Sequence, residues 1–406
     1  MKSIVKYLIV DLDQSFCRID ISKEILFKFF FASPFIFFKA LILLLKSKSE
    51  AKYFISKQKK IDCSQIPFNK NILELISDYK NNGYKIILAT GAPKLYADEV
   101  KKHFNFFDEV LSSTKTYNNV GNNKLISIKE KIKDSEYIYI GDSKQDLPIW
   151  LDAKKAIVVG NRKILKSLKS KNVEIVKFLK TKVSLFKLFF QQIRAHQWSK
   201  NFLLFAPVLA SHSLSSQKVF FNTLIAFISF SLIASCIYIF NDIIDIDNDR
   251  FHNVKKNRPI ASGYFPIQYS FLIIGFFFPI GFFFGSLIGS SFLIFEFIYI
   301  ILNIYYSFLG KRIIILDMIL LMLFYTLRLI LGHIANDIPF SPWLLSFAMF
   351  LFFSLGVLKR YSDLVLSNSN ESNLFGRGYL AADKNILLSL GVGSGLISSL
   401  VLILYT

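Results

Sequence analysis

The spacing of apolar residues changes near position 200 of this 406-residue chain. Beyond that point, apolar runs of membrane-spanning length recur with few charges, whereas helices of soluble cores are usually shorter and amphipathic. We predict about seven spans, of which the first is short and interrupted by Pro207. They cover approximately 199–213, 219–241, 267–285, 287–308, 313–332, 341–358 and 386–405. Residues 199–406 are therefore predicted to form an all-α polytopic membrane bundle.

Residues 1–165 have a different pattern, in which short β-type runs alternate with helical stretches. This alternation is typical of an α/β domain with a parallel sheet. The four predicted strands are Tyr7–Val10, Lys85–Leu88, Tyr137–Ile140 and Ala156–Val159.

An apolar segment at 25–45 interrupts the soluble part. Lys28, Pro34 and Lys39 break it, so we predict a pair of helices that lies on or dips into the membrane surface. The alternative is a true span, which would reverse the orientation of every later helix.

Charge is distributed unevenly along the chain, whose net charge is +20. The first 200 residues carry 37 Lys and Arg against 19 Asp and Glu, and the last 206 carry 12 against 10. A basic linker is predicted at 166–198, beside the membrane, where anionic lipid headgroups would attract it. We expect no nucleic-acid partner, and the three cysteines form no C-x-x-C pair, which excludes a disulfide framework and a Cys-based zinc site.

Loop cations indicate the membrane orientation. No signal peptide is expected, because Asp11 interrupts the first apolar run. With the N-terminus inside, the cytoplasmic loops after spans two, four and six hold ten of the eleven loop cations. The opposite loops hold only Lys218. We therefore predict a multi-pass protein of the inner (plasma) membrane with a cytoplasmic N-terminal domain.

Acidic and small polar residues follow the predicted strands. Asp11 and Asp13 follow the first strand, Thr90 the second, and Asp142 and Asp146 the third. The carboxyl ends of parallel strands form the ligand crevice of a doubly wound sheet, so these side chains are expected to meet there. Carboxylates at this edge suit Mg²⁺, which we expect Asp142 and Asp146 to hold.

This set of residues suits phosphoryl transfer. Asp11 would attack phosphorus to form an aspartyl-phosphate, and Asp13 would act as general acid and base. Thr90 would donate to the phosphoryl oxygens, and Lys124 would neutralise their charge.

In order and spacing, these motifs resemble those of the haloacid-dehalogenase-like (HAD-like) phosphatases, over residues 1 to about 165. The resemblance implies a Rossmann-like α/β domain with a helical cap at about 20–75 that selects the substrate. One departure is Gln14-Ser15 in place of the usual Gly-Thr, and Gln14 is expected to crowd the site. A phosphatase fold that has lost activity and serves as an anchor or regulator is the alternative.

The membrane half concentrates its acids at the end of the second span. Asp242, Asp245 and Asp249 lie within an arc of about 60° on one helical face, whereas Asp247 points away. Three such carboxylates would repel one another unless a divalent cation bridged them, so we predict a Mg²⁺-diphosphate site. A solvated acidic loop is disfavoured, since the basic residues Lys255 and Arg258 follow closely.

Other polar groups mark the ends of the spans. Arg328 lies eleven residues after Asp317 on nearly the same face, roughly 16 Å deeper, where it is expected to have an anionic partner. The predicted substrate-binding residues are Lys200, Asn201, Asn241, Lys255, Arg258, Tyr306, Lys311, Asp317 and Arg328.

Three motifs resemble those of the UbiA superfamily of intramembrane prenyltransferases, over about residues 190–406. They are N-D-x-x-D-x-x-x-D from Asn241, K-x-x-R-P-x-x-S-G at Lys255–Gly263, and Y-S-x-x-x-K with Asp317. In that family the first motif holds Mg²⁺ and the prenyl diphosphate. The second motif, here Lys311 and Asp317, helps to bind or activate the acceptor.

Two departures qualify this resemblance. The second motif has one aspartate, and together with Gln197–Asn201 and Arg328 it looks more like the branch that transfers phosphoribose from phosphoribosyl diphosphate to decaprenyl phosphate. Family members normally have nine spans, so the last two are expected to be missing.

We therefore expect a bifunctional membrane enzyme. The bundle would transfer a group from a Mg²⁺-bound diphosphate, with a polyprenyl (di)phosphate lipid as substrate, and a phosphatase is attached. The transferred group is either prenyl or phosphoribosyl, because both donors leave diphosphate through a carbocation-like transition state. In the remaining alternative, the membrane half is only a lipid-binding anchor for the phosphatase.

Overall fold

The computed structural model describes residues 6–133, 135–160, 162–180, 183–366 and 378–405. The chain forms two compact units, each described separately below. The first contains residues 1–189 together with 242–270, and the second contains 190–241 together with 271–406. The acid-rich segment after the second predicted span therefore packs with the α/β domain.

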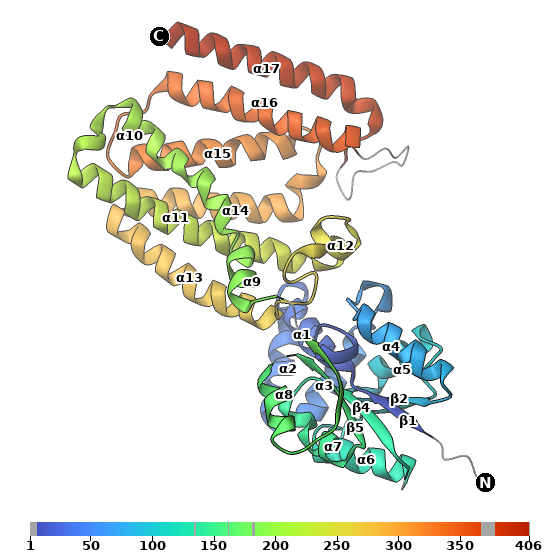
Figure 1. Cartoon of the computed structure of the whole chain (residues 1–406). Helices are drawn as coiled ribbons and strands as arrows, with labels where there is room; N and C mark the ends of the chain where they lie inside the picture. The colour runs from blue at the N-terminus through green and yellow to red at the C-terminus, as the bar shows by residue number, and fades with distance from the viewer. Residues whose placement is uncertain (1–5, 134, 161, 181–182, 367–377, 406) are drawn as a thin grey trace. The chain divides into compact units, whose positions relative to one another are not determined.

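The first unit is built on a six-stranded parallel sheet (Figure 1). Its spatial order is β3-β2-β1-β4-β5-β6. β2 pairs with one side of β1 and β4 with the other, so the strand order reverses at β1, which opens a crevice at the carboxyl ends of these strands. The strands are β1 Tyr7–Val10, β2 Lys85–Pro93, β3 Glu109–Ser113, β4 Tyr137–Gly141, β5 Lys155–Gly160 and β6 Ile175–Lys180.

Two strands, β3 and β6, were not predicted. β6 pairs with β5 from within the stretch interpreted as a basic linker, so the sheet extends past residue 165. The strand was hidden because it lies at an edge and carries Lys177 and Lys180, as edge strands often do. The prediction that 166–198 is only a linker is therefore wrong for its first part.

Alternate strand residues pack on opposite faces of the sheet. Leu8 and Val10 contribute to the core beneath α4, α5 and the cap, while Ile9 contributes to the core beneath α6, α7 and α8 (Figure 1). Because both faces are covered, the strands read as continuous apolar runs. The helices are α4 Lys70–Asn81, α5 Lys94–His103, α6 Asn122–Ile132, α7 Leu147–Asp152 and α8 Arg162–Lys169.

A helical cap follows β1, as predicted. It consists of α1 Ile21–Ala32, α2 Pro34–Lys46 and α3 Lys48–Gln58. Pro34 begins α2 at a position where its missing N–H is not needed, so the apolar segment forms two helices and not one span. The acid-rich segment contributes α12 Ile246–Phe251 to this unit.

The second unit is a bundle of apolar helices. Six of the described helices are long and apolar enough to cross a membrane, which fits a multi-pass membrane protein. They are α11 Gln217–Ile244, α13 Ile267–Ile288, α14 Ser290–Phe308, α15 Leu316–Ile334, α16 Pro342–Leu366 and α17 Lys384–Tyr405. α16 and α17 run side by side (Figure 1).

The first predicted span, 199–213, is not one long helix. After α9 Leu185–Gln192, it is a 3₁₀ segment, Ala195–Phe205, followed by the short α10 Ala206–Ala210. The 3₁₀ segment packs so closely on α15 that a Cβ at Gly332 would lie 2.3 Å from the Leu204 carbonyl oxygen. A seventh crossing stays a prediction.

The sixth predicted span, 341–358, is longer in the structure. α16 continues to Leu366 and therefore includes Lys359 and Arg360, which were assigned to a loop. Arg360 is buried within the helix, so counting it among the cations of the loop after this span was wrong. Arg377, another of those cations, lies outside the described residues.

Candidate functional site

The crevice of the α/β domain contains three carboxylates. Asp11 directly follows β1, and its backbone N–H donates to the Ile140 carbonyl of β4 at 3.0 Å. Asp142 and Asp146 follow β4. Each of these three aspartates offers a carboxylate oxygen, and these oxygens all lie within 4.8 Å of one another. Among the residues that the structure describes, this is the only group with such spacing.

Asp146 is rigidly held. One of its oxygens accepts a hydrogen bond from the Tyr139 hydroxyl at 2.7 Å, and the other accepts from the Ser143 backbone and hydroxyl, both at 3.1 Å. Hard oxygen donors on a fixed frame are what Mg²⁺ requires, so this donor set fits the ion. Sequence reasoning missed Tyr139, which reads as an ordinary strand residue.

Lys124 supplies the positive charge in this crevice. Its ammonium lies 2.8 Å from Asp11 and 3.3 Å from Asp146, and it is buried. Burial raises the pKa of Asp11 to about 6 although Lys124 opposes the shift. Burial and the neighbouring Asp11 and Asp146 raise the pKa of Asp142 to about 8. The crowded negative charge therefore favours a further cation.

Asp13 stands apart from the three-carboxylate group. It accepts a hydrogen bond from the Ile21 backbone N–H at 3.0 Å, at the start of α1. Burial, followed by repulsion from Asp20, raises its pKa to about 7. A carboxyl group with that pKa can both give and take a proton near neutral pH.

The remaining predicted residues of the crevice are also placed by the fold. Thr90 was predicted to follow the second strand, but it lies within β2, which continues to Pro93. It is fully buried, and its hydroxyl accepts from the Ala92 backbone N–H at 2.9 Å. Gln14 adopts a left-handed backbone conformation with φ of 59° and is exposed. It lines a pocket with Arg18 and Gly263. Ser15, its neighbour, donates to Asp142 at 3.4 Å.

Lys52 is a residue that sequence reasoning missed. It belongs to cap helix α3, and its ammonium donates to the Gly91 carbonyl at the end of β2 at 2.8 Å. No local sequence signal identifies it, because only the folded cap brings α3 over the strand ends.

The acid motif of residues 242–249 is divided by a break between α11 and α12, at Asp245. Asp242 and Asp249 are buried and share one cation, since an Arg258 nitrogen donates to them at 3.0 Å and 2.6 Å. Burial raises the pKa of Asp249, and Arg258 opposes that shift. Carboxylate oxygens are the ligands that Mg²⁺ prefers. In this structure the Arg258 guanidinium links the carboxylates of Asp242 and Asp249.

The other residues of this segment face elsewhere. Asp247 pairs with Lys28 of α1 at 2.6 Å and lies 4.0 Å from Lys59. Lys255 is half-buried just before Arg258. In the second unit, Asn241 accepts a hydrogen bond from the Ser307 hydroxyl.

Asp317 is fully buried in the helical bundle. Arg360 binds it with two nitrogens, at 2.5 Å and 3.0 Å, and the Tyr306 hydroxyl donates to it at 3.0 Å. Sequence reasoning missed the role of Arg360, because the end of α16 was predicted too early. Lys311 is half-buried in the turn before α15.

Arg328 is buried among polar and aromatic groups. It donates to the Asn201 side chain at 2.9 Å and to the Phe324 carbonyl. Its guanidinium lies over the rings of Phe230, Tyr299 and Tyr325 at 5.1, 5.7 and 5.3 Å. Lys200 lies over Tyr325 at 5.6 Å.

Comparison with known proteins identifies both halves. Residues 202–364 match the UbiA prenyltransferase family, and residues 26–150 match the haloacid dehalogenase-like hydrolases. An uncharacterized protein y4nM of Sinorhizobium fredii is 32% identical over 98% of this chain and 77% of that protein. The chain belongs to the UbiA prenyltransferase family.

Further similarities concern the UbiA half. The decaprenyl-phosphate phosphoribosyltransferase of Corynebacterium glutamicum is 34% identical over 43% of this chain and 54% of that protein. A UbiA homolog from Archaeoglobus fulgidus, solved with DMAPP and Mg²⁺, has 17% identity and a TM-score of 0.44, over 52% of this chain and 75% of that one.

These assignments confirm the predicted fold classes. The chain is an enzyme in which a HAD-like α/β domain with a helical cap precedes a UbiA-type membrane bundle.

Lys124 is open to a direct test. Lys124→Met leaves Asp11 and Asp146 without their buried cation, so phosphate release from p-nitrophenyl phosphate should fall by a factor on the order of 100. The matched control is Lys129→Met, on the same helix, which removes only an exposed ion pair with Asp152 and should change the rate less than twofold. Equal rates for Lys124→Met and the wild type would contradict the assignment.

The acid motif makes a second prediction. Asp242→Asn and Asp245→Asn should abolish transfer, measured as release of inorganic diphosphate from the donor, because each removes a predicted ligand of Mg²⁺-diphosphate. Asp247→Asn should be mild, since that side chain faces Lys28. Equal losses in all three variants would show that Asp247 does not differ in role from Asp242 and Asp245.

Proposed function

We propose that this chain carries out two consecutive reactions on a membrane lipid. The UbiA half transfers a phosphoribosyl group from phosphoribosyl diphosphate to a polyprenyl phosphate, and the HAD-like domain removes the phosphate from the sugar. The proposal rests on the presence of two kinds of site in one chain. A crevice with Asp11, Asp13, Lys124, Asp142 and Asp146 belongs to the same chain as a segment similar to decaprenyl-phosphate phosphoribosyltransferases.

The acid motif would bind the donor. Asp242, Asp245 and Asp249 would hold Mg²⁺, with Lys255 and Arg258 close enough in sequence to bind phosphate oxygens. When bound, Mg²⁺ neutralises the diphosphate and so makes it a better leaving group.

The state of Asp317 supports phosphoribosyl transfer. The second motif has this one aspartate, as in the phosphoribosyl-transferring branch, and its carboxylate binds Arg360 and accepts a hydrogen bond from Tyr306. Lys311, Lys200 and the Asn201–Arg328 pair would then serve the acceptor phosphate and sugar.

Prenyl transfer is the second candidate. The breadth of the match to the prenyltransferase family, over 202–364, favours it, and the same acid motif would serve a prenyl diphosphate. A prenylated aromatic product would, however, carry no phosphate for the attached phosphatase to remove.

The phosphatase step would follow from the crevice. An Asp11 oxygen attacks phosphorus, and the departing sugar oxygen takes the proton of Asp13. Asp13 then removes a proton from water, which attacks the aspartyl-phosphate, releases inorganic phosphate and restores Asp11. The pKa of about 7 supports both roles of Asp13.

The cap supports a lipid-borne substrate. α2 exposes an apolar stripe, in which Phe35 is 76% and Leu45 89% exposed, with Phe38 and Ile42 between them. Residues 25–49 contain no acid. Such a helix suits the interface of an anionic membrane, where it would bring the crevice to the lipid. Together with the basic segment and the loop cations, this helix supports a cytoplasmic location of the domain at the plasma membrane.

The proposed relay predicts a specific intermediate. Wild type and Asp11→Asn are supplied with phosphoribosyl diphosphate and polyprenyl phosphate, and the lipids are analysed by mass spectrometry. Asp11→Asn should accumulate a lipid-linked phosphosugar that the wild type converts to the dephosphorylated form.

Parallel incubations with labelled prenyl diphosphate distinguish the second candidate. If label is transferred only from prenyl diphosphate, the transferase reaction is prenyl transfer and not phosphoribosyl transfer. Identical lipid products from wild type and Asp11→Asn would refute the proposed dephosphorylation step. Phosphate release without transfer from either donor would leave the membrane half as an anchor.

A further inference from the structure

Cap helix α1 of the HAD-like domain contacts the acid motif of the UbiA half, inside the first compact unit. Glu24 of α1 accepts two parallel hydrogen bonds from Arg250, which directly follows Asp249, at 2.8 Å and 2.7 Å. Both side chains are buried, at 6% and 7% exposure. Bidentate pairs of this type fix orientation as well as supplying attraction.

The same ion pair organises the surrounding loop. The remaining donor of Arg250, Nε, binds the Ala261 carbonyl at 3.0 Å, which ties α12 to the segment after Arg258. Lys28, one turn after Glu24, lies 2.9 Å from Glu24 and 2.6 Å from Asp247. α1 therefore contacts the acid motif on both sides of Asp249, and the two-fold hydrogen-bonded contact is the one to Arg250.

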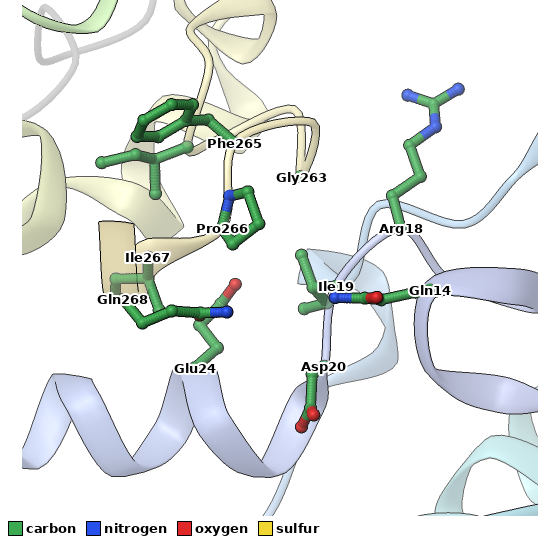
Figure 2. A pocket seen from close by; sticks show the side chains of 11 residues that line it. Gln14, Arg18, Ile19, Asp20, Glu24, Gly263, Phe265, Pro266, Ile267 and Gln268 are labelled. Carbon is green, nitrogen blue, oxygen red and sulfur yellow. The ribbon is translucent and has the colours of Figure 1, made fainter. Parts of the chain in front are cut away.

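A second contact lies between the segment after Asp13 and the loop at 260–268. Gly263 has φ of +77°, and a Cβ there would lie 2.9 Å from the Arg18 Cβ and from Ile19. The Arg18 guanidinium lies over the Tyr264 ring at 4.6 Å. Figure 2 shows the pocket along this seam, with Glu24 rising from α1 on one side and Gly263 on the other.

Removing the charge of Glu24 is costly in this setting. Burial raises the pKa of Glu24, but Arg250 and Lys28 outweigh burial and hold that pKa at about 2. A neutral side chain would leave the buried guanidinium of Arg250 without its carboxylate partner, whereas Lys28 would keep its pair with Asp247.

We propose that Glu24 is a positioning residue of the transferase. From the phosphatase domain it fixes Arg250, and through Arg250 it keeps the Asp249–Arg258 pair in the geometry that binds the donor diphosphate. The HAD-like domain is thus a structural part of the transferase site. This inference rests on the proposed donor-binding role of the acid motif.

The test compares full-length Glu24→Gln and Arg250→Lys with wild type. Arg250→Lys keeps the charge but loses the paired hydrogen bonds. Both variants should raise the donor KM for transfer at least tenfold with a smaller change in kcat, and phosphate release from p-nitrophenyl phosphate should stay within twofold. Glu50→Gln, which removes the charge of a half-buried glutamate of α3 that lies 3.8 Å from Lys115, is the matched control and should behave as wild type.

A charge exchange adds specificity. Glu24→Arg alone should lose transfer, and Glu24→Arg with Arg250→Glu should recover a substantial part of it. No recovery, together with an unchanged KM in Glu24→Gln, would overturn the proposal.

Limited trypsin digestion without ligands gives a readout independent of activity. Loosening of the loop in Glu24→Gln should speed cleavage after Lys256, which is exposed, at least several-fold. Unchanged cleavage would contradict the positioning role. If the wild type transfers from no donor, the proposed function fails, whereas the cleavage rates still decide whether Glu24 holds the motif.

Discussion

Negative charge buried in this chain needs a nearby cation, and that requirement organises its sites. Lys124 serves Asp11 and Asp146, and Arg258 serves Asp242 and Asp249. Away from water, an unpaired carboxylate would instead take up a proton. Each site therefore contains a cationic side chain of the protein itself. We propose that Mg²⁺ and a phosphate group bind beside this side chain during catalysis.

The same requirement joins the phosphatase domain to the transferase motif. The Glu24–Arg250 pair is as buried as the Lys124–Asp11 pair, and it connects α1 with α12. α1 also begins at the backbone N–H that binds Asp13. One helix thus contacts the general acid proposed for the second reaction and the motif proposed for the first. Tethering of this kind raises the effective concentration of each site for the product of the other.

Much of this architecture could be predicted from the sequence, because long apolar runs and strand-end aspartates are local signals. β6 was not predicted because lysines interrupt its apolar pattern. The position of Arg360 was not predicted because the sequence marks the end of a helix only weakly. Glu24 and Lys52 gave no local signal. Their roles depend on where the cap packs, which brings together residues more than 200 positions apart in the case of Glu24 and Arg250.

The most direct test of the central claim, that the two sites work as one unit, is a time course of the lipid-linked phosphosugar. Wild type is compared with an equimolar mixture of full-length Asp11→Asn and Asp242→Asn, dilute in detergent micelles and at equal concentrations of each intact site. For wild type we expect little accumulation and no lag in phosphate release. The mixture should show accumulation and a lag, because the intermediate must pass between molecules. Superimposable time courses would contradict the central claim.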